Sequence, residues 1–188
     1  MSKYDEENIV ERLRNETTKK KAFEEIVNKH SRTLYWQIRH IIINHDDTDD
    51  VLQNTLLKAW KSIDSFAGDA KISTWLYRIA YNESLNFIKQ RKETASCSAD
   101  TDGDEQTAGS AMQIAGEDYI DGDKVQMMLQ EAIAQLPAKQ KAVFTMKYFN
   151  EMKYEEMSEV TQTSVGALKA SYHIAVEKIT AYIKTHTL

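Results

Sequence analysis

The chain has 188 residues, of which 41% are hydrophobic and 28% are charged, and this composition is typical of one or two small globular domains. One proline and six glycines are too few turn-forming residues for a protein built on β-sheets, so we expect an all-α protein. The single cysteine, Cys97, excludes an intramolecular disulfide, and neither a signal peptide nor an apolar run of membrane-spanning length is present, so we expect a cytoplasmic protein without membrane insertion.

The formal net charge of −5 is concentrated in one segment. Residues 93–123 contain nine acidic residues and no lysine or arginine, whereas residues 1–92 carry 16 basic and 14 acidic residues, and residues 124–188 carry 8 and 6. The same segment is rich in Ser, Thr, Ala and Gly and has no periodicity. We therefore predict two small helical domains, 1–92 and 124–188, joined by a flexible acidic linker over 93–123.

The first domain begins with three predicted helices, over about 4–14, 19–43 and 46–63, the last capped by Asp46 or Asp47. The third helix is predicted to bury one stripe, made of Val51, Leu52, Leu56, Ala59, Trp60 and Ile63. Its opposite side carries Asp50, Gln53, Asn54 and Leu57. A leucine among polar residues indicates a protein-docking patch. A solvated face with one exposed leucine is the alternative.

The next stretch combines a loop, aromatic residues and positive charge. Gly68 lies in the loop, and from Ile72 the pattern is helical, with one apolar stripe at Ile72, Trp75, Leu76 and Ile79. A second side carries Tyr77, Tyr81, Leu85 and Ile88, and the basic residues are Lys71, Arg78, Lys89, Arg91 and Lys92. This combination suits single-stranded nucleic acid, because cations follow phosphates and aromatic rings stack on unpaired bases. The alternative is a central helix that is packed on both sides.

The second domain is predicted to hold a helix from about 125 to 133 and another from 138 to 149, followed by a helix-turn-helix. Its short first helix spans 154–160, and Ser164 caps a last helix that runs to about 184. The last helix buries Val165, Leu168, Tyr172, Ala175, Val176, Ile179 and Ile183. Small residues on its outer face would let it enter a DNA groove, or would pack on another helix.

Together these pieces resemble the extracytoplasmic-function (ECF) sigma factors of bacterial RNA polymerase. The first domain resembles sigma region 2 in its motifs D47-T-D-D-V-L-Q-N54, F66-A-G-D69 and S73-T-W-L-Y-R-I-A-Y-N82. The second domain resembles sigma region 4 in L136-P-A-K-Q, Y148-F, Y154-E-E-M-S-E and S164-V-G-A-L-K169. The order and spacing of these motifs extend over nearly the whole chain.

The resemblance implies a role for each face, and it implies no catalysis, metal or cofactor. The core polymerase would contact Asp49, Asp50, Gln53, Asn54 and Leu57. The −10 promoter element would contact Ser65, Phe66, Gly68, Asp69, Lys71, Ser73, Thr74, Trp75, Arg78 and Asn82, with a flipped-out base captured by the loop 65–71. The −35 element would contact Ser164, Gly166, Lys169, Ala170, Ser171, His173 and Ile174. An anti-sigma factor is a further partner that is usual for the family.

One departure from the family pattern concerns the last helix. Many relatives carry arginines there, where this chain has Ser171, Ile174 and Val176. Fewer charged contacts predict weaker binding to duplex DNA and a shallower salt dependence.

Three other interpretations are open at this point. The run D46-D-T-D-D50 fits the magnesium-binding DDxxD motif of helical prenyl synthases, but no second such cluster is present. A free-standing helix-turn-helix regulator would bind duplex DNA without polymerase. A two-domain helical scaffold without a nucleic-acid role would leave the basic aromatic helix unexplained.

Overall fold

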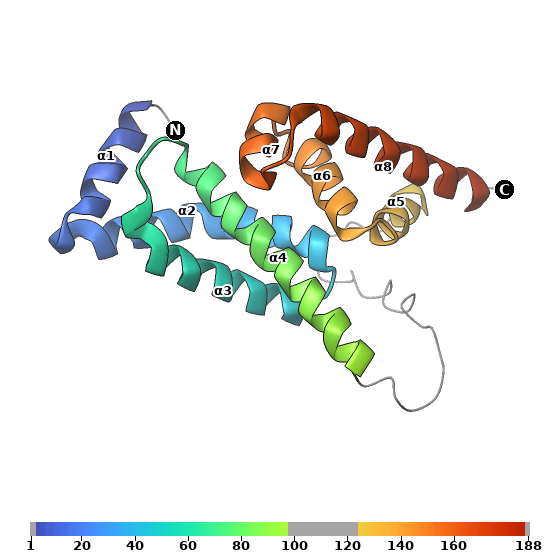
Figure 1. Cartoon of the computed structure of the whole chain (residues 1–188), viewed down its shortest axis with the longest axis horizontal. Helices are drawn as coiled ribbons and strands as arrows, with labels where there is room; N and C mark the ends of the chain where they lie inside the picture. Colours follow the sequence, from blue (N-terminus) through green and yellow to red (C-terminus); the bar gives the residue numbers. More distant parts are fainter. Residues whose placement is uncertain (1–2, 98–123, 187–188) are drawn as a thin grey trace.

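A computed structural model of the chain describes residues 3–97 and 124–186, and within these ranges every regular element is a helix (Figure 1). The first range contains α1 (Lys3–Arg14), α2 (Glu16–Ile42), α3 (His45–Ser62), the 3₁₀ turn η1 (Ile63–Ser65) and α4 (Ile72–Cys97). The second contains α5 (Lys124–Ala134), α6 (Ala138–Tyr148), α7 (Tyr154–Thr161) and α8 (Val165–His186). The all-α prediction is confirmed.

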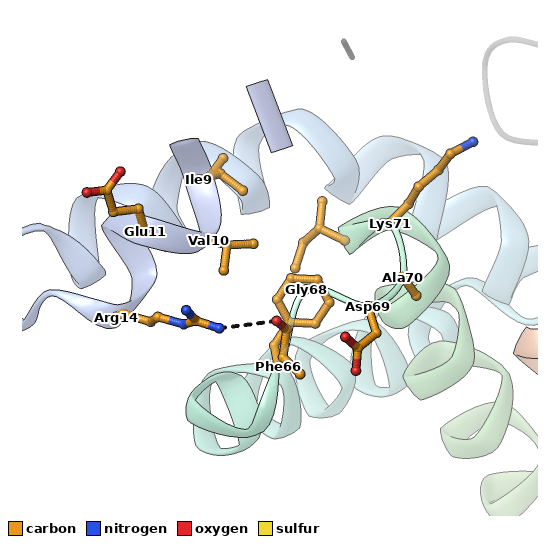
Figure 2. Close-up of a pocket in the computed structure, with 11 residues that line it drawn as sticks. Ile9, Val10, Glu11, Arg14, Phe66, Gly68, Asp69, Ala70 and Lys71 are labelled. Carbon is orange, nitrogen blue, oxygen red and sulfur yellow. Dashed lines mark hydrogen bonds between the residues drawn. The ribbon is translucent and has the colours of Figure 1, made fainter. Parts of the chain in front are cut away.

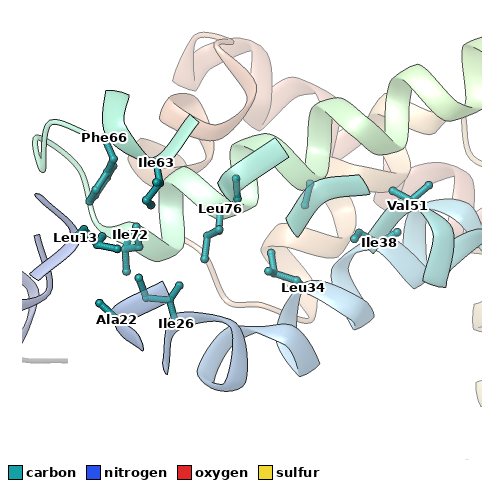
Figure 3. Packing of buried hydrophobic residues seen from close by; sticks show 12 residues of the cluster. Leu13, Ala22, Ile26, Leu34, Ile38, Val51, Ile63, Phe66, Ile72 and Leu76 are labelled. Atoms are coloured by element: carbon teal, nitrogen blue, oxygen red, sulfur yellow. The ribbon is translucent and has the colours of Figure 1, made fainter. Parts of the chain in front are cut away.

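The first domain is a bundle of α1 to α4, in which α2 packs against the other three helices. Its core is one continuous hydrophobic cluster that includes Leu34, Ile38 and Leu76, each at most 1% exposed (Figure 3). Leu13 of α1 also belongs to this cluster, at 4% exposed. The predicted stripes of the second, third and fourth helices therefore meet as expected, because helical periodicity places them on one face.

Short polar residues set where the helices begin. The Asn15 side chain accepts a hydrogen bond from the Thr17 N–H (3.0 Å), and the Ser164 hydroxyl accepts one from the Ala167 N–H (3.3 Å). The prediction that Asp46 or Asp47 caps α3 is wrong. Asn44 is the cap and accepts from the Asp47 N–H at 3.0 Å, so Asp46 and Asp47 lie in the first turn, near the positive end of the helix dipole.

The helix α4 runs five residues beyond the predicted end of the first domain, to Cys97. Thr94 donates a hydrogen bond to the Gln90 carbonyl oxygen (3.0 Å), and Lys89 pairs with Glu93 one turn later (3.7 Å). Both interactions join residues four positions apart, which lie one turn from each other on a helix. The rest of the predicted linker, 98–123, lies outside the described residues.

The second domain is formed by α5 to α8, and α7 and α8 make the predicted helix-turn-helix. Gln162, in the left-handed conformation (φ 54°), ends α7, and α8 starts three residues later. One side of α8 packs on α5, α6 and α7 through Leu168, Ala175 and Ile179.

The two domains contact each other. Ile41 of α2 and Tyr81 of α4 are buried in one cluster with Met146, Met157 and other apolar residues of α6 to α8. The helix α4 thus packs on α2 and α3 within the first domain and on α7 of the second domain (Figure 1). Next to Ile41, the His40 ring of α2 stacks on Phe149, which follows α6, with centroids 4.3 Å apart.

Candidate functional site

The predicted docking face on α3 is exposed. Asp49, Asp50, Gln53 and Asn54 all lie in solvent, and Leu57 is 52% exposed. The opposite side of the helix is buried through Val51, Thr55 and Ala59. The pattern prediction that separated these two sides is confirmed for Val51, Ala59 and Leu57. It is wrong for Trp60, which was expected in the buried stripe and is 39% exposed, with its ring against Phe23 at the edge of the bundle.

The loop between η1 and α4 lies against α1, and the two together line a cavity of about 490 Å³ that is open to solvent (Figure 2). Gly68 adopts a φ of +86°, a backbone conformation that glycine accommodates without strain. The Arg14 guanidinium donates a hydrogen bond to the Ala67 carbonyl oxygen at 3.2 Å, and Asp69 and Lys71 are exposed at the rim. The loop is therefore held in a defined shape beside a space that is large enough for a small ligand.

Eight of the ten residues predicted to contact the −10 element are at least partly exposed. Ser65, Gly68, Asp69, Lys71, Arg78 and Asn82 lie in solvent, whereas Ser73 and Trp75 are half-buried.

The other two predicted contacts, Phe66 and Thr74, are buried. Phe66 is 8% exposed, belongs to the core cluster and packs on Trp75 with centroids 5.3 Å apart. Thr74 is 6% exposed. Phe66 follows η1 in an extended conformation and Thr74 lies in the first turn of α4, and both side chains are packed in the core of this structure, so little of either is exposed to solvent. Phe66 instead forms part of the cavity wall.

The second aromatic side of α4 is not open for bases in this structure. Tyr81 is buried in the cluster between the domains, and Tyr77, Leu85 and Ile88 pack against it. Burial raises the pKa of Tyr77 and of Tyr81. On this side the alternative prediction, a central helix packed on both sides, is the correct one.

An ion pair joins the loop to the second domain. The Lys71 ammonium donates to a Glu156 carboxylate oxygen of α7 at 3.0 Å, and this hydrogen bond is the main cause that lowers the pKa of Glu156. The Glu156 carboxylate also accepts from the Lys153 backbone N–H (3.3 Å), which supports the first turn of α7. A residue of the predicted −10 face is thus in contact with the helix-turn-helix.

The outer face of α8 is open. Gly166, Ala167, Ala170, His173 and Ile174 are exposed, and a Cβ added at Gly166 would meet nothing within 4 Å.

Two neighbouring residues complete this face of α8. Ser171 is only partly exposed, and the Lys169 ammonium lies 5.7 Å from the centre of the Tyr154 ring. The exposed small-residue face that the periodicity predicted is therefore confirmed.

Two features were not predicted from the periodicity of the sequence. No role was expected for α1, although Ile9, Val10, Glu11 and Arg14 line the cavity beside the loop. The burial of Lys141 on α6, which is 6% exposed, was not expected either. No local signal reveals either feature, because both depend on segments distant in the sequence.

The described ranges contain no group of three or more His, Cys, Asp or Glu side chains placed to hold a metal ion. None of the helices at 3–97 and 124–186 is both long and apolar enough to span a membrane.

Comparisons with known proteins agree on both domains. The family model described as Sigma-70 region 2 matches residues 26–94, and the one described as Sigma-70, region 4 matches residues 126–179. The chain is 31% identical to the ECF RNA polymerase sigma factor SigW of Bacillus subtilis, over 81% of this chain and 83% of that protein. It is 27% identical to the RNA polymerase sigma-H factor of Pseudomonas aeruginosa, over 93% and 91% of the two chains.

Two solved structures share the fold. One is the sigma factor RpoE in complex with the anti-sigma factor NepR from Bartonella quintana, with a TM-score of 0.72, 21% identity and coverage of 87% of this chain and 98% of that one. The other is CnrH in complex with the cytosolic domain of CnrY, with a TM-score of 0.66, 20% identity and coverage of 94% and 96%.

Proposed function

Because the chain belongs to the sigma-70 family and is an RNA polymerase sigma factor of the ECF type, we propose that its three exposed faces bind the core polymerase, the −10 element and the −35 element. The observation that carries the proposal is the loop 66–71, fixed beside a cavity at the start of the basic helix α4. Melting a promoter requires a site for an unpaired base, and this loop offers one. The protein would act in the cytoplasm as a specificity subunit and without catalysis of its own.

The α3 face would dock on the polymerase through Leu57 and the polar residues around it. Exposed leucine in a polar rim is typical of a small protein interface. We expect Asp50→Ala/Gln53→Ala to weaken binding to the core enzyme. A matched control is Glu24→Ala/Asn28→Ala, which removes one acid and one amide from exposed positions of α2. Equal affinity of both variants for the core enzyme would refute this assignment of the α3 face.

The loop and α4 would receive the −10 element as a separated strand. Asn82 and Arg78 are exposed one turn apart on α4, where they can reach bases and phosphates. We expect Asn82→Ala to change the base preference at the −10 element. Transcription from a promoter library randomised at this element measures the preference, and an unchanged preference would remove Asn82 from the contact surface.

The outer face of α8 would enter the major groove at the −35 element. Ile174, 42% exposed, and Ala170 can contact thymine methyl groups, and Lys169 can contact a phosphate. With one lysine on this face, isolated protein should bind duplex DNA weakly and with a shallow salt dependence. Tight, sequence-specific binding without polymerase would favour a free-standing regulator instead.

We further propose that the two domains separate when the protein joins the polymerase. The contact between them covers Tyr81 and engages Lys71, which supports a closed free form. Fluorophores can be attached through Asn28→Cys and His173→Cys in a chain whose native cysteine is removed by Cys97→Ser. Energy transfer between the two fluorophores should fall when core enzyme is added. Unchanged transfer would show that the domains stay together.

A protein inhibitor of the anti-sigma type is proposed as a further partner, since the sigma factor RpoE, which has the same fold, is found in complex with the anti-sigma factor NepR. It would cover the α3 face or hold the two domains together, and in the second case energy transfer between the same labels would stay high in the presence of core enzyme.

The decisive experiment is transcription in vitro from a genomic library with core polymerase and this protein, followed by mapping of start sites. New starts that share two spaced elements would support the proposal and would give both promoter sequences. No new starts together with no core binding would overturn it.

A further inference from the structure

We propose that α1 forms the second wall of the base-binding cavity and that Arg14 is a positioning residue for the capture loop. The inference rests on the proposed function of that loop. The cavity of about 490 Å³ is bounded on one side by residues 66–72 and on the other by Ile9, Val10, Glu11 and Arg14 of α1 (Figure 2). This volume lies within the range of roughly 300–1,000 Å³ that is usual for small-ligand sites.

The helix α1 is firmly attached to the domain, as a cavity wall must be. Leu13 is 4% exposed in the core cluster. The Arg12 guanidinium makes two hydrogen bonds to the Glu25 carboxylate of α2, each 2.7 Å long, in the bidentate geometry that fixes orientation. The match to Sigma-70 region 2 begins only at residue 26, so this wall comes from a part of the chain that precedes the matched segment.

Val10 determines how closely the loop approaches α1. A Cβ built at Gly68 would lie 3.3 Å from a Val10 methyl carbon, so the loop backbone is in close contact with this side chain. The φ of +86° at Gly68 turns the chain at the same point. The size of residue 10 therefore limits how closely the loop can approach α1.

Arg14 fixes the neighbouring peptide. Its guanidinium Nη2 donates to the Ala67 carbonyl oxygen at 3.2 Å, and this hydrogen bond connects residues 53 positions apart in the sequence. Because the bond restrains the peptide that precedes Gly68, Arg14 acts on a bound base through the shape of the loop. Its role is positioning and not direct contact.

The chemistry of the walls suits an unpaired base. Val10 and Phe66 give apolar surface for a base to pack against, and the exposed Asp69 carboxylate lies at the edge of the cavity (Figure 2). A carboxylate accepts hydrogen bonds from the exocyclic amino group of cytosine or adenine. The occupant is therefore a flipped-out base with an exocyclic amino group.

The test uses holoenzymes made from the full chain and a promoter library randomised across the −10 element. Val10→Trp fills the cavity and should reduce discrimination at one −10 position at least tenfold, and Val10→Ala should change the preference at the same position. Arg14→Ala should reduce discrimination there by roughly threefold to tenfold, the effect of losing one hydrogen bond of ordinary strength. Arg14→Lys, which keeps a charged donor, should restore part of it.

Two controls separate a change of the site from general damage. Arg32→Ala removes one exposed arginine of α2 outside the cavity and should leave the −10 preference unchanged. Each variant should keep its melting temperature, its affinity for core enzyme and its −35 preference.

Asp69→Ala separates the role of α1 in the cavity from the capture function of the loop. If Asp69→Ala changes the preference and no variant of Val10 or Arg14 does, the role of α1 is refuted and the capture loop stands. If none of these variants changes it, the capture function of the loop is refuted as well.

Discussion

Lys141 offers a sharp test of how the second domain is packed. It lies on α6, only 6% exposed, and burial lowers the pKa of its ammonium group from 10.5 to about 8. At about 1.4 kcal/mol for each pKa unit, this change corresponds to about 3 kcal/mol of unfavourable free energy for keeping the charged form in the folded protein. Replacing Lys141 with methionine, which has a similar length and no charge, should remove this cost.

The sign of the pH dependence follows from the direction of the pKa change. Between about pH 8 and pH 10.5 the folded protein has released the Lys141 proton while the unfolded chain still binds it. The free energy of unfolding of the wild type therefore rises with pH over this window. The stability advantage of Lys141→Met should be largest at pH 7 and should shrink by about 3 kcal/mol by pH 10.5.

Urea unfolding followed by circular dichroism, at pH 7 and at several values up to pH 10.5, measures this difference. Lys139→Met is the matched control, because Lys139 lies on the same helix and is exposed. Other titrating groups are common to all three proteins and cancel in the comparison. If the advantage of Lys141→Met over wild type is the same at pH 7 and pH 10.5, the inferred burial of a charged ammonium group is wrong.

Three further predictions concern stability. Gly68→Ala should destabilise the protein by roughly 1–2 kcal/mol, because the φ of +86° at this position is unfavourable for alanine. Adding Val10→Ala should recover only the part of this loss that comes from the steric contact with Val10. Full recovery of the free energy of unfolding, measured with urea, would show that the backbone conformation is not the cause. Met157→Ala should cost about 2–5 kcal/mol, since Met157 is fully buried between the domains, and a loss below 1 kcal/mol would contradict this packing. Burial lowers the pKa of His40 below 6.5, so the unfolded chain binds a proton first as the pH falls, and stability should drop below about pH 6.5. Thermal melts at pH 7 and pH 5 should show a smaller drop for His40→Phe, which keeps a ring against Phe149, and an equal drop would exclude His40 as a contributor.

Helical periodicity in the sequence was enough to predict the helices and most of the faces they expose, with Trp60 as an exception. The spacing of apolar residues separates the buried Val51 side of α3 from its exposed Leu57 side, and it does the same for Leu168 and Ile174 on α8. These assignments need no knowledge of distant segments, because a residue's face on a helix follows from its position in the repeat.

The motifs that indicated sigma regions 2 and 4 are also local in sequence, and the comparisons confirmed the family that they indicated. Which individual side chains of these regions touch DNA or polymerase is still a prediction.

Only the tertiary structure decided what covers each apolar face and what closes the cavity. The pattern showed that Tyr81 lies on a second apolar side of α4, but not that the second domain covers that side. The hydrogen bond from Arg14 to Ala67 joins positions 53 residues apart, and the ion pair of Lys71 with Glu156 joins positions 85 apart. A sequence period reports the chemistry of a face, whereas its partner depends on how the whole chain packs, and for that reason the wall formed by α1 had no signal in the sequence.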